Sequence, residues 1–83
     1  MLRARDAGFE FLLRELDLAL TFVSVAKATA HRSRRIRNRG YASEACEVVS
    51  KFRHRLKLSA QQEQELSERL SRLESLIASV PEP

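Results

Sequence analysis

A long amphipathic pattern opens the chain and predicts a helix over residues 7–30. Apolar residues recur there at spacings of three and four, as on one face of an α-helix. They are Phe9, Leu12, Leu13, Leu16, Leu20 and Val23. Leu18, Phe22 and Val25 widen this stripe until only one polar edge remains. Such a helix is typically buried between partners, so we expect it at the centre of the fold, with Asp6 as its N-cap.

A second helix is predicted over residues 34–56. Its apolar positions step by three and four and are Ala42, Ala45, Val49, Phe52 and Leu56. The start of this helix is open to two interpretations. Ser33 could cap a start within the preceding arginine-rich stretch, whereas Gly40 permits a later start after Asn38. Ile36 is about half a turn out of phase with Ala45, which favours the later start or a contact on another face.

The third predicted helix, over residues 60–80, has the clearest boundaries. Ser59 and Gln62 have the spacing of a capping box, and Pro81 ends the helix before a short tail at 81–83. A narrow apolar stripe predicts an outer helix with one contact face, formed by Leu66, Leu70, Leu73, Ile77 and Val80. Two favourable i,i+4 ion pairs are expected on its surface, Glu65 with Arg69 and Glu68 with Arg72.

Three helices with short connections predict an all-α, antiparallel three-helix bundle, and the 83 residues form a single domain, 1–83. The composition agrees, because 43% of the residues are hydrophobic and only two are glycine and two proline. A chain this apolar is unlike a disordered one. Its one cysteine excludes a disulfide framework.

The net charge of +4 is unevenly distributed along the chain. Residues 18–43 carry six basic groups and no acidic one, whereas residues 58–83 are net acidic. The candidate polyanion-binding residues are the five arginines of the 31–39 stretch: Arg32, Arg34, Arg35, Arg37 and Arg39. Arginine binds phosphate through paired N–H donors, so such a cluster favours a polyanion. The alternative is a solvated helix junction, with Glu63, Glu65 and Glu68 folding back to compensate the arginines.

Motifs for catalysis are missing from the sequence. It has no glycine-rich phosphate loop, no paired-histidine motif and no Cys/His cluster with metal-ligand spacing. His31 and His54 are expected to be surface residues, and Cys46 a small buried hydrophobic residue. We therefore expect no catalytic residues, no metal or other cofactor, and no small-molecule substrate; the protein is not expected to be an enzyme.

The expected location is the cytoplasm, without membrane attachment. The longest uncharged stretch of the first helix is nine residues, Leu18 to Ala26. A spanning helix needs about 20 apolar residues. Acidic residues also interrupt the first 17 positions, which is unlike a secretory signal.

Two resemblances cover parts of the chain. The segment from Glu15 to Phe22, reading ELDLALTF, resembles the opening helix of small bacterial three-helix proteins without an assigned activity. Residues 35–41 and 56–59 are similar to later helix entries of the same proteins, so the resemblance implies the bundle fold. More weakly, residues 40–45 and 72–76 are similar to microtubule-interacting-and-trafficking domains and tetratricopeptide hairpins. That second resemblance implies binding of a peptide between helices.

These observations lead us to expect a small non-catalytic protein–protein interaction module. Its partner would be a helix of another protein laid along an apolar seam, or a second copy of the chain. The interpretation predicts an exposed apolar strip outside the core that includes Tyr41 or Phe11. The alternative is nucleic-acid or polyanion binding through the arginine-rich junction.

Overall fold

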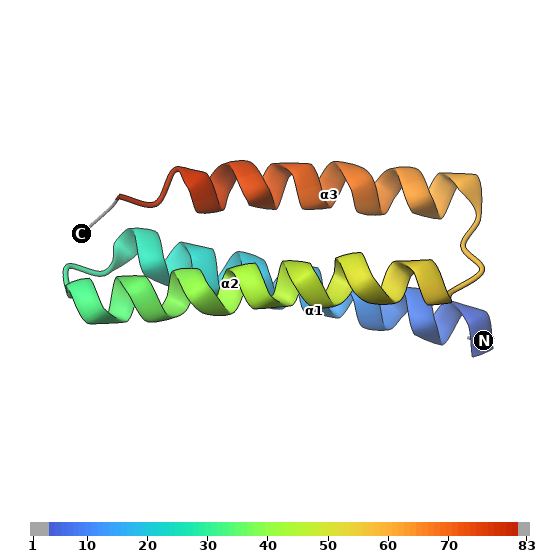
Figure 1. Cartoon of the computed structure of the whole chain (residues 1–83), viewed down its shortest axis with the longest axis horizontal. Helices are drawn as coiled ribbons and strands as arrows, with labels where there is room; N and C mark the ends of the chain where they lie inside the picture. Colours follow the sequence, from blue (N-terminus) through green and yellow to red (C-terminus); the bar gives the residue numbers. More distant parts are fainter. Residues whose placement is uncertain (1–3, 82–83) are drawn as a thin grey trace.

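The structure is a computed structural model that describes residues 4–81, and it is an antiparallel bundle of three helices (Figure 1). Helix α1 spans Ala4–Ala28, α2 spans Arg32–Phe52 and α3 spans Ala60–Ala78, and a 3₁₀ turn, η1, continues α2 over Arg53–Arg55. The described chain contains no strand, and its extents are 42 × 20 × 18 Å. The predicted all-α three-helix fold is confirmed.

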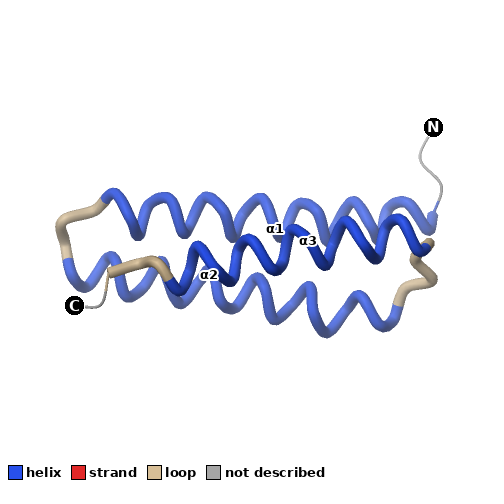
Figure 2. The backbone as a smooth tube through the Cα atoms, turned by 90° about the horizontal axis from the view of Figure 1, so that it is seen from above, coloured by secondary structure: helices blue, strands red, loops and turns tan. Residues whose placement is uncertain are grey.

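The three helices are not packed equally against one another. Helices α1 and α2 form the closest pair, and α3 contacts both of them less extensively. In Figure 1, α3 lies along one side of the α1–α2 pair, and the perpendicular view of Figure 2 places it over the space between them. The opposite side of the α1–α2 pair is covered by no other helix of the described chain.

The core lies where the three helices meet. Its largest fully buried side chains are Leu12, Leu16, Val23, Val49 and Leu66. The small residues Ala19, Ala26, Ala42 and Ala45 are buried as well, and small side chains let two helix backbones approach closely. All of these buried residues are apolar, so the core of the described chain contains no buried polar or charged residue.

The expectation that the first helix is buried around most of its circumference is wrong. Phe11, Leu18, Leu20 and Val25 are between 38% and 46% exposed. The reason is geometric: two neighbouring helices cover only part of a helix surface, and α3 presents a narrow stripe. Asp6 is also not an N-cap, because it lies within α1, which begins at Ala4.

Helix α2 begins earlier and ends earlier than predicted. It starts at Arg32, with His31 at the N-cap position, so Ser33 and Gly40 both lie inside the helix. His31 makes no side-chain cap hydrogen bond. The early start leaves Ile36 on the solvent side, where it is 51% exposed. After Phe52 the chain tightens into the η1 turn, so Leu56 lies outside the helix, although it packs against the core.

Helix α3 begins with the predicted capping box. The Ser59 hydroxyl accepts a hydrogen bond from the Gln62 N–H at 3.1 Å, and the Gln62 side chain accepts one from the Ser59 N–H at 2.9 Å. The helix ends at Ala78, two residues before the predicted end, and Val80 still packs in the interior. Of the predicted 81–83 tail, residues 82 and 83 lie outside the described residues.

Arg53 joins the end of α2 to the beginning of α3. Its Nη2 atom donates to the Glu63 carboxylate at 3.0 Å, to the Ser67 hydroxyl at 2.9 Å and to the Glu63 carbonyl at 3.4 Å. Only 15% of the Arg53 side chain is exposed. These contacts place the acidic first half of α3 beside the end of α2. The expectation that Glu63, Glu65 and Glu68 compensate the 31–39 arginines is therefore wrong, because they lie at the other end of the bundle.

The two ion pairs expected on α3 have different outcomes. Glu65 and Arg69 form the predicted pair at 3.3 Å. Glu68 instead accepts a hydrogen bond from the Gln64 side chain at 3.3 Å, and the described residues include no Glu68–Arg72 pair. Arg69 also lies 3.8 Å from the Asp17 carboxylate of α1. Both partners of this second pair are well exposed, so it contributes little to stability.

Candidate interaction face

Exposed apolar side chains gather on the side of the α1–α2 pair that faces away from α3. On α1, Phe11, Leu18 and Val25 are seven residues apart and therefore lie in one row along the helix. Phe22 lies beside this row and is half-buried. The row is rotated by about 140° around the helix axis from Leu12, Leu16 and Val23, which fill the core.

Helix α2 contributes the second row. Tyr41 and Val48 are also seven residues apart, and Phe52 follows one turn later. Two aromatic pairs join the rows across the helix pair. Phe11 and Phe52 meet edge to face with ring centroids 6.3 Å apart, and Phe22 and Tyr41 are 5.1 Å apart. We call this surface the outer face; it consists of Phe11, Leu18, Phe22, Val25, Tyr41, Val48 and Phe52.

A shallow groove runs along the middle of the outer face. It is lined by Glu15, Leu18, Phe22, Tyr41, Glu44, Ala45 and Val48. The two carboxylates come from different helices, Glu15 from α1 and Glu44 from α2, and neither forms an ion pair with a described residue. The groove therefore combines apolar walls with two acidic groups near its midpoint.

The five arginines of the 31–39 stretch do not form one surface. Their spacing along α2 places Arg32, Arg35 and Arg39 on one side and Arg34 and Arg37 on the opposite side. Arg35 is half-buried, and its Nη2 atom donates to the Thr29 carbonyl at 3.2 Å. Arg39 is also half-buried and lines a groove between α2 and α3. The structure thus separates the residues that the sequence grouped as one candidate polyanion site.

Arg34 and Arg37 border the outer face. Arg34 is seven residues before Tyr41, and Arg37 is four residues before it, so both extend the α2 row toward the end where Val25 lies. Both side chains are exposed, and neither pairs with an acidic group of the described chain. At the other end of the row, the Arg55 guanidinium lies over the Phe52 ring at 5.1 Å.

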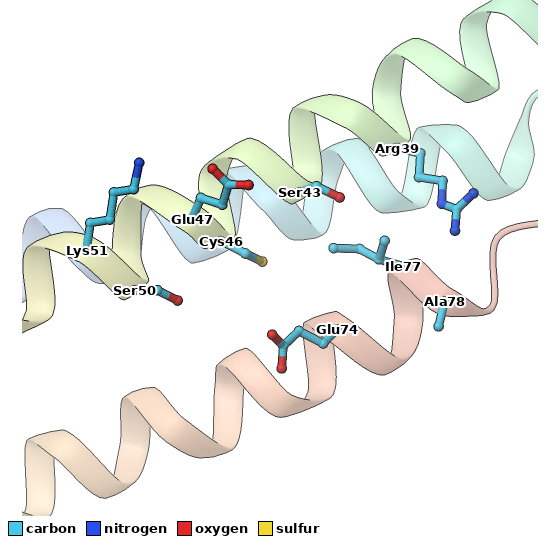
Figure 3. Close-up of a pocket in the computed structure, with 9 residues that line it drawn as sticks. All are labelled: Arg39, Ser43, Cys46, Glu47, Ser50, Lys51, Glu74, Ile77 and Ala78. Atoms are coloured by element: carbon cyan, nitrogen blue, oxygen red, sulfur yellow. The ribbon is translucent and has the colours of Figure 1, made fainter.

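A different groove, between α2 and α3, contains the only cysteine of the sequence (Figure 3). Cys46 is buried as predicted, and its sulfur points toward α3, whereas Glu47 and Lys51 point away from it (Figure 3). Burial raises the pKa of the Cys46 thiol, and the negative charge of Glu74 raises it further. The thiol is thereby held in its protonated, weakly nucleophilic form.

The two histidines are exposed, as predicted, His31 at the N-cap of α2 and His54 in η1. Within residues 4–81, no group of three or more His, Cys, Asp or Glu side chains is arranged to hold a metal ion. Among the described helices, none combines the length and apolar character needed to cross a membrane.

Comparisons with protein-family models, with curated proteins and with solved structures give no match to this chain.

Sequence reasoning anticipated part of the outer face. The sequence predicts an exposed apolar strip that includes Tyr41 or Phe11, and both residues are more than 40% exposed. The periodicity places Leu18, Phe22 and Val25 in the buried stripe of the first helix; Phe22 does pack against the core, whereas Leu18 and Val25 are exposed. The available signal was the spacing of seven that links Phe11, Leu18 and Val25, which marks a second row beside the core row.

Proposed function

We propose that this protein is a small, non-catalytic helical interaction module that binds another protein through its outer face. The observation that carries the proposal is the double row of apolar side chains on the side of the α1–α2 pair that α3 leaves uncovered. Exposed large apolar residues scattered singly are normal, but these lie in register on two adjacent helices.

The anchors on this surface are of the kind that protein interfaces use. Aromatic residues are enriched at binding hot spots because they bury a large area with few rotatable bonds. Four of the outer-face residues are aromatic, and their rings are already held against one another in two pairs. Little further ordering is needed when a partner binds, which favours affinity.

Polyanion binding, the alternative function, has weaker support. Arg35 and Arg39 are half-buried and make contacts within the protein, and the remaining arginines point to opposite sides of α2. A phosphate backbone would therefore meet only part of the cluster at one time.

Site-specific photocrosslinking in the host cells tests the proposal on the full chain. A photoreactive phenylalanine derivative at position 18 is expected to give a discrete covalent adduct with a partner protein. The same derivative at position 71, an exposed serine on α3, serves as the control and is expected to give none.

Two substitutions test whether the adduct forms through the outer face. In the chain labelled at position 18, Tyr41→Glu is expected to abolish the adduct, whereas Leu20→Glu is not. Leu20 is 45% exposed and matches Leu18 in exposure, but it lies between α1 and α3. Identical adducts from positions 18 and 71, or no adduct from position 18, would contradict an interaction through the outer face.

A further inference from the structure

We infer that the occupant of the outer face is an amphipathic helix of a partner protein, with basic side chains at its middle and acidic side chains at one end. This inference rests on the proposed function and specifies the chemistry of the partner. It follows from the shape of the groove and from the order of the charges along it.

The shape of the outer face fits a helix. Two packed helices form a groove on each side of the pair; α3 lies over one side of the α1–α2 pair, and the groove on the other side is open to a further helix. The α1 anchors Phe11, Leu18 and Val25 repeat every seven residues, the spacing that meets a helical partner at every second turn. From Phe11 to Val25 the row spans about 21 Å, so an occupant of about 15 residues would cover it.

The middle of the groove favours a basic side chain. Glu15 and Glu44 approach this region from both helices, and Glu15 is half-buried. Neither carboxylate has an ion-pair partner in the described chain, so covering the groove with an apolar helix would desolvate two uncompensated charges. A lysine or arginine of the partner at this level offsets part of that cost.

One end of the groove favours acidic side chains. Arg34 and Arg37 extend the α2 row beyond Tyr41 and are exposed, without an ion pair in the described chain. Carboxylates of the partner beside them would form charge-assisted hydrogen bonds. Because the acidic middle and the basic end are different, the charge order also sets the direction in which the partner helix lies.

The same charges disfavour a second copy of this chain as the occupant. A two-fold pairing that buries the whole outer face of both copies places their midpoints together, and with them Glu15 and Glu44 of each copy. Four unpaired carboxylates would then gather at one level. In addition, each chain has a net charge of +4, which opposes self-association.

Two synthetic helical peptides of identical composition test the inference. Both peptides carry leucines at heptad positions. The matched peptide has two lysines at its middle and two glutamates at one end, whereas the permuted peptide has the two glutamates at its middle and the two lysines at that end. Fluorescence anisotropy with the full chain is expected to show at least tenfold tighter binding of the matched peptide. Amide chemical-shift changes on binding should concentrate at outer-face residues such as Leu18 and Tyr41.

Charge-reversal variants test whether Arg34 and Arg37 bind the acidic end of the matched peptide. Arg34→Glu with Arg37→Glu is expected to weaken binding of the matched peptide at least tenfold. Arg32→Glu with Arg72→Glu makes the same change in net charge at exposed positions away from the outer face, and it is expected to leave binding within about twofold of the parent. Circular dichroism verifies that both double variants remain helical.

The inference would be overturned if the two peptides bound equally well or not at all, or if both double variants lost the same peptide affinity. It would also be overturned if random-sequence RNA bound more tightly than the matched peptide and this binding depended on Arg34 and Arg37. Self-association in sedimentation that Leu18→Glu abolishes would overturn it as well. The crosslinking experiment separates these failures from failure of the proposed function. An adduct at position 18 without peptide discrimination retains the interaction face and rejects its charge assignment.

Discussion

The α1–α2 pair has two apolar sides, and only one of them is covered. On the side toward α3, Leu12, Leu16 and Val49 are almost completely buried. On the outer face, Leu18 and Tyr41 are 46% and 42% exposed, although both sides are apolar. Burial in this protein is therefore decided by where α3 lies, because the apolar character of a helix face does not specify which neighbour covers it.

The comparison also shows how the exposed side is kept ordered. The outer-face aromatics contact each other across α1 and α2, so their rings are partly protected from water without a third helix. Charged residues lie beside these aromatic residues along the whole outer face. Glu15 and Glu44 lie near its middle, and Arg34, Arg37 and Arg55 lie toward its ends. Such charges limit non-specific association of an exposed apolar surface.

The largest expected difference between the two sides is in stability. Leu12→Ala removes a fully buried side chain and should lower the free energy of unfolding by about 2–5 kcal/mol. Leu18→Ala, the same substitution on the same helix, should cost less than about 1 kcal/mol because its side chain is already half-solvated. Urea denaturation followed by circular dichroism measures both. Equal losses would mean that the outer face contributes to the core.

A smaller effect is expected where α3 is held onto the pair. Arg53→Met keeps much of the side-chain volume but removes the hydrogen bonds to Glu63 and Ser67, and it should destabilise the protein by about 1.5–3 kcal/mol. Arg69→Met is the control, because its ion pairs with Glu65 and Asp17 are exposed and should contribute less than about 1 kcal/mol. If thermal melting shows the same loss for both variants, the Arg53 contacts do not hold α3 in place.

The smallest expected effect is a gain in stability. Gly40 lies inside α2, and beyond its chain neighbours and its own helix backbone no atom lies within 4 Å of an added Cβ, so Gly40→Ala should stabilise the protein by about 0.5–1 kcal/mol through reduced chain entropy. Gly8→Ala should gain less, because its Cβ would lie 2.9 Å from Leu56 Cδ2 and displace that side chain. Differential scanning calorimetry can compare the two. A decrease for Gly40→Ala would indicate that this part of α2 is not helical in solution.

Much of the fold could be predicted from local patterns. The capping box of Ser59 and Gln62 marked the start of α3 to the residue, because both partners of the motif are close in sequence. The core leucines of α3 were equally predictable from their spacing. The start of α2 was not, because the first turn has neither a side-chain cap nor an acidic residue, so local signals pointed to a later beginning.

The candidate site was only partly predictable. Periodicity identified apolar residues on α1 but assigned Leu18 and Val25 to the core, since a stripe gives the direction of a side chain around the helix and not the presence of a neighbour. The arginines of the 31–39 stretch were grouped because they are adjacent in sequence. In the helix they point to opposite sides, and only Arg34 and Arg37 lie beside the outer face.

The sequence by itself determined that this protein is helical, where α3 begins, and which residues could be buried, because hydrogen bonds within a helix and the period of 3.6 residues are local properties. Only the tertiary structure decided which apolar face became the core and which charges border the outer face. Those outcomes depend on the placement of α3 over one side of the α1–α2 pair, and that placement is set by contacts between residues far apart in the sequence.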